Sequence, residues 1–247
     1  MRLVLICNRE LFVFVRLAPA AATRCKPASA AAVGIVGARD PPHCRRGRGD
    51  LTPGSPMPMP TSPPARPVSI LGPTLETARL WLRPTAAEDF ERWAQFCADE
   101  RAMRWLGGVQ SRALAWRTFA TMAGSWATRG YGMYSLLDKA SGRWLGRVGP
   151  WMPEGWPGTE VGWGLHPEAQ GRGYAHEAAV AAIDWAFDAL GWTEVIHNID
   201  PGNEPSAALA RRLGSRVLRT ARMPAPFEGM EVEVWGQTRE EWRARRG

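Results

Sequence analysis

The sequence predicts an α/β fold of the α+β type, in which about four helices cover a mixed, mostly antiparallel sheet of about seven strands. The middle of the chain alternates strand, helix and strand over residues 159–199, and such a unit requires a parallel pair of strands. On either side of it lie pairs of strand patterns joined by short turns, which are typical of antiparallel hairpins. The 247 residues are 45% apolar and 22% charged, which is the composition of a globular protein.

The first strand and the first two helices follow from periodicity and from end signals. Residues 77–83 alternate polar and apolar side chains and stop at Pro84, which predicts a half-buried strand. A capping box directly after this proline predicts a helix over 85–98. A second helix is expected over 111–128, and Gly130 should end it.

The central strands follow these helices. Two strands, over 131–138 and 143–151, are expected to form a hairpin around the turn at 139–142. The next strand, over 159–166, contains two glycines, which often mark a bulge or a close approach of another backbone.

The C-terminal third continues the alternation of helices and strands. Apolar residues at helical spacing predict a helix with one buried face over 175–190. A strand, a short helix and two closing strands are then expected over 194–199, 205–213, 216–222 and 231–237. The arginine-rich run over 239–246 is expected to be a solvated tail.

Residues 1–72 are expected to form a disordered segment that precedes a domain over 73–247. All thirteen tryptophans lie in the later domain, whereas the first 56 residues are rich in Ala, Arg and Pro. These 56 residues hold nine Lys or Arg residues and three acidic residues, and the rest of the chain holds 22 bases and 21 acids. If translation starts at Met57 or Met59, the basic segment is not part of the native protein.

Several classes of protein are disfavoured. No apolar run is long enough for a transmembrane helix, so we expect no membrane partner. Four cysteines without a CxxC pair predict neither a disulfide scaffold nor a metal site. Arg9 and Glu10 interrupt the apolar run near the start, which a secretory signal tolerates poorly, so we expect a cytoplasmic location.

The most informative segment is a glycine-rich turn, Gln170-Gly-Arg-Gly-Tyr-Ala175, between the strand at 159–166 and the following helix. Backbone N–H groups at a helix N-terminus form an anion site that suits a pyrophosphate. A dinucleotide fingerprint would need a third glycine where His176 stands, and a Walker A loop would need Gly-Lys-Ser/Thr.

The pattern of Gln170, Gly173 and Ala175 resembles the acetyl-CoA motif of the GNAT N-acetyltransferase superfamily. Further segments resemble its ribosomal-protein N-acetyltransferase (RimJ/RimL-like) branch, and the resemblance covers about residues 73–243. These segments are Leu75–Pro84, Gly173–Ala178, Asn203–Ala207 and Arg212–Gly214. One departure is Ser215, where the family usually has an aromatic residue, and we expect weaker local packing there.

The resemblance implies a GNAT fold with a V-shaped opening between two splayed parallel strands, in which acetyl-CoA binds without a metal. It implies that the pantetheine arm pairs with the backbone around Leu165. Asn203 would hydrogen-bond this arm or the neighbouring strand. The pyrophosphate would lie on Gln170, Gly171, Arg172, Gly173, Tyr174 and Ala175.

Two residues are candidates for proton transfer. Glu160 is either an exposed strand carboxylate or a base that accepts the amine proton, directly or through water, because only a neutral amine attacks a thioester. Ser206 is either an ordinary helix residue or a donor to the departing thiolate, since no tyrosine follows Tyr174. Cys97 lies on an early helix and is not placed to form a covalent intermediate.

These inferences predict an N-acetyltransferase that transfers acetyl directly to a primary amine, either a protein N-terminus or a small molecule. One rival is an inactive acyl-CoA-binding module that retains Gly173 and lacks the base. A second rival is a nucleic-acid-binding protein that uses the basic segment, although we expect no nucleic-acid partner. The protein is expected to be a monomer or a homodimer.

Overall fold

The computed structural model describes residues 7–8, 11–12, 66, 69 and 71–247, in two units, 1–56 and 57–247, that are treated separately. In the first unit, β1 (Cys7–Asn8) and β2 (Leu11–Phe12) form an antiparallel pair. Most of the segment predicted to be disordered lies outside the described residues.

The second unit makes its first described contacts just before residue 73. The Arg66 guanidinium donates to the Thr74 carbonyl oxygen at 2.7 Å. Gly72 packs so closely on Trp126 that a Cβ at this glycine would lie 2.6 Å from the indole ring. Arg66 and Gly72 thus both contact residues of the later domain.

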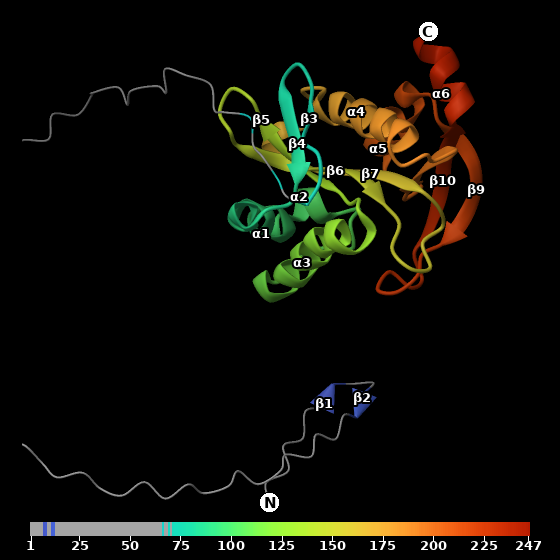
Figure 1. Cartoon of the computed structure of the whole chain (residues 1–247). Coiled ribbons are helices and arrows are strands. Elements are labelled where there is room, and N and C mark those ends of the chain that lie inside the picture. Colours follow the sequence, from blue (N-terminus) through green and yellow to red (C-terminus); the bar gives the residue numbers. More distant parts are fainter. Residues whose placement is uncertain (1–6, 9–10, 13–65, 67–68, 70) are drawn as a thin grey trace, which may run out of the picture. The chain divides into compact units, whose positions relative to one another are not determined.

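The second unit is built on one eight-stranded sheet (Figure 1). Neighbouring strands of this sheet run antiparallel, except for one parallel pair, β7 and β8. The prediction of a mixed and mostly antiparallel sheet is therefore confirmed. In spatial order the strands are β3 (Leu75–Glu76), β4 (Leu80–Pro84), β5 (Tyr134–Asp138), β6 (Trp144–Trp151), β7 (Glu160–Leu165), β8 (Glu194–Ile199), β10 (Glu231–Thr238) and β9 (Arg216–Arg222).

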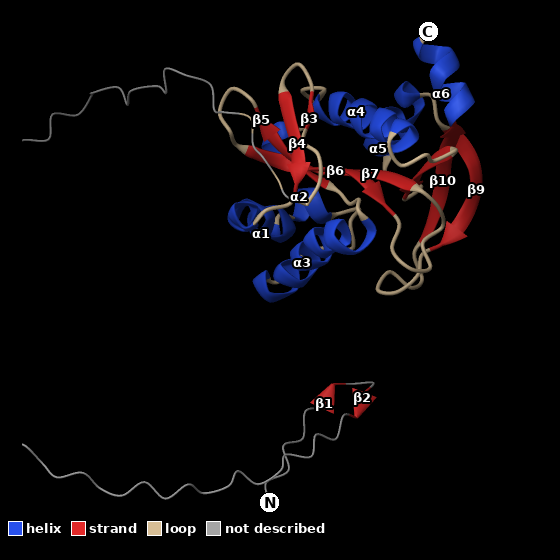
Figure 2. Cartoon of the chain, viewed as in Figure 1, coloured by secondary structure: helices blue, strands red, loops and turns tan. Residues whose placement is uncertain are grey.

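Helices cover both faces of this sheet (Figure 2). Three lie on one face, namely α1 (Phe90–Ala98), α2 (Glu100–Met103) and α3 (Arg112–Arg129). On the other face lie α4 (Tyr174–Asp188) and α5 (Glu204–Leu213), and α6 (Arg239–Arg246) ends the chain. Two short 3₁₀ turns, η1 (Ala87–Asp89) and η2 (Pro167–Ala169), precede α1 and the glycine-rich loop. No helix in the described part of the chain is both long and apolar enough to cross a membrane.

The strand predicted over 77–83 is β4, which begins at Leu80, and a further short strand, β3, precedes it, so the sheet has eight strands. The chain turns after β3, where the Thr77 N–H donates to the Leu80 carbonyl oxygen at 3.0 Å. The predicted capping box is also shifted by one residue. Asp89 accepts from the Ala86 N–H at 3.0 Å and pairs with the buried Arg83 at 2.7 Å.

The predicted solvated tail is wrong, because residues 239–246 form α6. Thr238 Oγ1 accepts from the Glu241 N–H, and Glu241 Oε2 accepts from the Thr238 N–H, which makes a capping box. Trp242 is buried and donates its indole N–H to Asp184 of α4 at 2.7 Å. A single tryptophan among charged residues gives only a weak helical periodicity. The capping box is the local sequence feature that indicates this helix.

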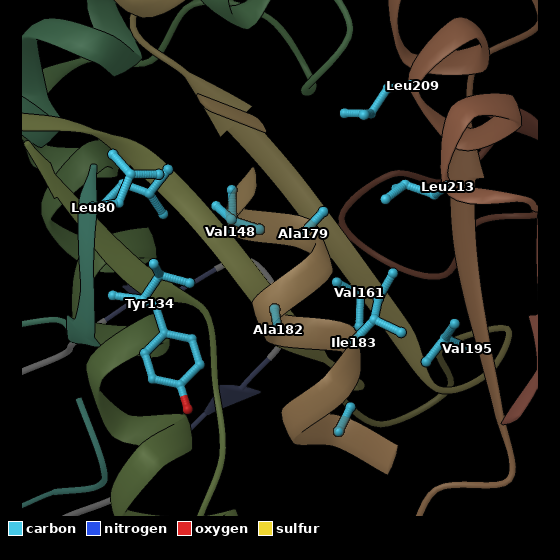
Figure 3. Packing of buried hydrophobic residues seen from close by; sticks show 14 of the residues in the cluster. Leu80, Tyr134, Val148, Val161, Ala179, Ala182, Ile183, Val195, Leu209 and Leu213 are labelled. Carbon is cyan, nitrogen blue, oxygen red and sulfur yellow. The ribbon is translucent and has the colours of Figure 1, made fainter. Parts of the chain in front are cut away.

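The packing of α4 on the sheet positions the end of β7. Ala179, Ala182 and Ile183 of α4 are buried against Val148 and Val161 of the two central strands (Figure 3). Alanine side chains are small, so the helix can lie close to the strands. This packing fixes the N-terminus of α4 beside the glycine-rich loop.

Candidate active site

The parallel strands β7 and β8 pair at a single position, Glu160 opposite Ile196. Beyond it, the hydrogen bonds between the two strands involve side chains, and the Asn198 N–H also donates to Glu160 Oε1 at 3.3 Å. His197 Nδ1 lies 2.7 Å from the Val161 carbonyl oxygen, and Asn198 Nδ2 donates to Glu160 Oε2 at 2.9 Å. The two strands therefore diverge, as predicted, and leave an opening beside the remainder of β7.

A first cavity of about 470 Å³, the loop cavity, lies where β7 ends and α4 begins. Gly171 and Gly173 have φ values of +75° and +78°, a left-handed conformation that side-chain-bearing residues rarely adopt. The first N–H groups of α4 have no acceptor within the helix, so they can bind an anion. Three arginines that were not predicted to bind the cofactor also line this cavity, namely Arg101, Arg104 and Arg212.

Seven of the predicted cofactor residues line the loop cavity, namely Leu165, Gln170, Gly171, Gly173, Tyr174, Ala175 and Asn203. Arg172 does not line it, and its carbonyl oxygen accepts from Arg79 instead. The Gln170 amide donates to the Leu165 carbonyl oxygen at 3.0 Å, which fastens the loop to the end of β7. Asn203 caps α5 by accepting from the Ser206 N–H at 3.3 Å.

Arg79, which sequence analysis did not single out, supports the loop from the turn between β3 and β4. Its guanidinium lies 4.5 Å from the centroid of the Tyr174 ring and pairs with Glu177 at 2.7 Å. Glu177 also accepts from the Thr77 hydroxyl at 2.6 Å. The motif at residues 75–84 contains both Thr77 and Arg79, so it was the feature of the sequence from which this support of the loop could have been predicted.

A second cavity of about 400 Å³, the Glu160 cavity, adjoins the loop cavity. Both cavities share one set of lining residues: Trp105, Leu106, Trp163, Asn203 and Ser206. The two cavities therefore lie next to each other at these five residues, and Ser206 is at their junction.

Glu160 is buried at the wall of this second cavity, so its interpretation as an exposed carboxylate is wrong. Burial raises the pKa of its carboxyl above the ordinary value, and the opposing hydrogen bonds and the charge of Arg147 offset only part of this effect. The carboxylate accepts from the Trp156 indole N–H and from Asn198. These two donors hold it in one orientation.

Ser206 occupies the junction of the two cavities. Its Oγ accepts from the Trp163 indole N–H at 3.1 Å. Since that bond uses an oxygen lone pair, the hydroxyl hydrogen is left to donate to another group.

A buried polar network of His197, Ser215 and Gln237 lies next to the point where β7 and β8 diverge. Because His197 Nδ1 donates to the Val161 carbonyl oxygen, its Nε2 accepts from the Ser215 hydroxyl at 3.1 Å. The Gln237 amide in turn donates to Ser215 Oγ at 3.0 Å. Ser215 is therefore buried and hydrogen-bonded. Where the family usually has an aromatic side chain, this protein has a serine that makes polar contacts.

Two other expectations concern cysteine and metal. Cys97 is buried, and burial raises the pKa of its thiol, so a reactive thiolate is disfavoured. In the part of the chain that the structure describes, no three His, Cys, Asp or Glu side chains are grouped to hold a metal ion.

Comparison with known proteins relates this arrangement to one family. A family model described as an acetyltransferase (GNAT) domain matches residues 79–216. The structure is similar to that of an acetyltransferase from Agrobacterium tumefaciens str. C58, with a TM-score of 0.62 and 32% identity over 71% of this chain and 100% of the other.

The chain is also similar in sequence to curated proteins, two of which are YkkB and p20. YkkB from Bacillus subtilis (strain 168) is 34% identical over 98 residues, which are 38% of this chain and 57% of that protein. The N-acetyltransferase p20 from Bacillus licheniformis is 27% identical over 165 residues, which are 66% of this chain and 93% of that protein. The chain thus spans somewhat over half the length of YkkB and nearly all of p20.

The buried network predicts a pH-dependent stability. Burial lowers the pKa of His197 to about 4, below its value of about 6.5 in an unfolded chain. The unfolded chain therefore binds the proton more strongly, so the free energy of unfolding should fall as pH drops from about 6.5 towards 4. The loss attributable to this group is about 3 kcal/mol.

Urea unfolding between pH 7.5 and pH 4.5 measures this effect. His197→Asn should flatten the dependence, whereas His176→Asn, at a partly exposed site, should keep most of it. An equal fall in the wild type and in His197→Asn would contradict the assignment.

Proposed function

Because the chain belongs to the GNAT acetyltransferase family, whose members use acetyl-CoA, we propose that it is an acetyl-CoA-dependent N-acetyltransferase acting on a primary amine. The observation that carries this proposal is the junction of the two cavities beside Ser206 and Trp163. A direct transfer needs two substrates that meet, and these cavities provide one space for each.

The loop cavity fits acetyl-CoA. Left-handed glycines and the start of α4 offer backbone N–H groups to a pyrophosphate, and Arg101, Arg104 and Arg212 add positive charge. Leu165 and Asn203 line the way from this loop to the junction, where the pantetheine arm would lie. When bound, acetyl-CoA supplies a thioester, and the amine nitrogen replaces its sulfur on the acetyl carbon.

Glu160 is the proposed base. The amine must lose a proton in the reaction, and a chain N-terminus has a pKa near 8 while that of lysine is near 10.4. The raised pKa of Glu160 makes its carboxylate a stronger proton acceptor than an exposed one, provided that the pH is high enough to ionise it. The presence of this carboxylate in the second cavity argues against an inactive acyl-CoA-binding module.

Ser206 is the proposed partner of the leaving sulfur. Its free hydroxyl hydrogen can donate to the negative charge that develops on sulfur, while Trp163 fixes the position of its oxygen. The acceptor is a protein N-terminus or a small-molecule amine, and the motif at 75–84 supports membership of the RimJ/RimL-like branch. A cytoplasmic location and a monomeric or dimeric state belong to the same proposal.

The assignment of the loop predicts the effect of a charge on acetyl-CoA binding. Gly173→Asp places a carboxylate where the phosphates would lie, so calorimetry should show affinity for acetyl-CoA weakened by about 10²-fold or more. Gly191→Asp is the control, because that exposed glycine also has a positive φ, +68°, and lies outside both cavities. Unchanged affinity in folded Gly173→Asp would refute the assignment.

The assignment of the base and of the hydroxyl predicts two different kinetic changes. Glu160→Gln should lower kcat/KM for the amine by about 10²-fold at neutral pH, and the loss should shrink at high pH, where the amine is already neutral. Ser206→Ala should lower kcat by a smaller factor and change acetyl-CoA affinity little, because charge on sulfur develops only in the transition state.

Stopped assays with detection of free thiol measure both changes. Glu154→Gln, at a fully exposed position, is the control for the amide substitution. Full activity of Glu160→Gln at every pH would show that another group or bulk water accepts the proton.

A further inference from the structure

Arg147 lies in the wall of the Glu160 cavity, and the proposed mechanism gives it no role. It stands on β6 opposite Gly164, near the middle of the sheet. Its Nε is buried without a hydrogen-bond partner, and its Nη1 lies 2.9 Å from Met133 Sδ. Within residues 71–247, no carboxylate forms an ion pair with it.

The Arg147 guanidinium is partly buried, and it has no carboxylate partner in the part of the domain that the structure describes. Buried charges are normally paired, as Arg83 is with Asp89 at 2.7 Å in this same domain. The guanidinium also lies over the Trp93 ring, 5.5 Å from its centroid. Because a thioether and a ring face are both weak hydrogen-bond acceptors, these contacts leave the N–H donors of Arg147 largely unsatisfied. The charge is therefore available to a ligand in the cavity.

Two glycines of β7 keep the space around Arg147 and Glu160 clear. A Cβ at Gly162 would lie 2.7 Å from Met133 Cε and 3.2 Å from Glu160 Oε1. A Cβ at Gly164 would approach Phe96 and Leu106 to 3.1 Å and Arg147 Nε to 3.8 Å. A side chain at either position would crowd the wall that carries both charged groups.

The remaining walls of the cavity are mostly apolar. They include five tryptophan or phenylalanine side chains and four methionine side chains, among them Trp105, Trp151, Trp156, Phe227, Met122 and Met230. A volume of about 400 Å³ suits a small molecule. The cavity thus combines an apolar body with one arginine, Arg147, and two carboxylates, Glu160 and Asp200, the second of which accepts from the Gly202 N–H at 2.8 Å.

We propose that the amine acceptor is a free amino acid with an apolar side chain, whose carboxylate binds Arg147 while its amine faces Glu160. This inference rests on the proposed function and names the substrate class of the same site. A carboxylate carries one negative charge and matches one guanidinium, whereas a phosphate dianion would bring an uncompensated charge near Glu160. A peptide N-terminus would lack this carboxylate.

The test compares three acceptors that share one apolar body: phenylalanine, phenylalaninamide and phenethylamine. Rates of thiol release are corrected for the fraction of neutral amine, so that differences in amine pKa do not enter. The wild type should acetylate phenylalanine with a kcat/KM at least about 30-fold above that of either uncharged analogue, as expected for a desolvated charge pair. Arg147→Gln should lose this preference by slowing phenylalanine alone.

Two further variants keep the test decisive. Arg147→Met has a similar length and no charge, and it replaces Arg147→Gln if the latter does not fold. Arg117→Gln, on the exposed surface of α3, should leave the preference unchanged. An equal loss on all three acceptors, or a wild type without any preference, would overturn the inference and show that Arg147 only tunes Glu160.

A binding measurement separates this inference from the proposed function. If acetyl-CoA binds and no acceptor is acetylated, the proposed function fails. The inference is then tested by calorimetry with N-acetylphenylalanine and its amide in the presence of CoA. Tighter binding of the acid by the wild type, lost in Arg147→Gln, would support the carboxylate site, and equal binding would overturn it.

Discussion

The structure depends on the divergence of two parallel strands. β7 and β8 share one pairing position, and every later residue of β7 lacks a backbone partner on that side. Unpaired backbone groups inside a protein are unfavourable, so the divergence persists only because other groups satisfy or replace the missing ladder. On the β8 side, His197, Asn198 and the buried Glu160 form hydrogen bonds in place of the missing backbone ladder. The opening that results is shared by both cavities.

The two sides of the opening are stabilised differently. On the α4 side, small alanines let the helix pack close to β6 and β7, and Arg79 and Gln170 hold the glycine-rich loop at its N-terminus. On the opposite side, the wall carries Glu160, which Trp156 and Asn198 hold by hydrogen bonds, and Arg147, which has no carboxylate partner among the described residues, among aromatic and methionine side chains. Both sides contain a hydrophobic core cluster, and the wall beside α1–α3 also carries the charged groups that are available for chemistry.

Much of this architecture could be predicted from local patterns. Helix capping, alternation and the glycine-rich turn indicated the order of the elements, the parallel pair and the loop that begins α4. Contacts between distant segments could not be predicted: Arg79 reaches Tyr174 and Glu177 across about a hundred residues, and Trp242 is buried against α4 from a charged tail. The burial of Glu160 and the unpaired state of Arg147 also depend on tertiary packing, which a single sequence does not display.

The central claim is that the divergence of β7 and β8 brings two substrates together beside Ser206. A crystal structure of the protein with CoA tests it most directly. The account predicts that the pyrophosphate lies on the backbone N–H groups at the start of α4, with the CoA sulfur within hydrogen-bond reach of Ser206 Oγ. A CoA sulfur far from Ser206, or a pyrophosphate bound away from the glycine-rich loop, would contradict it.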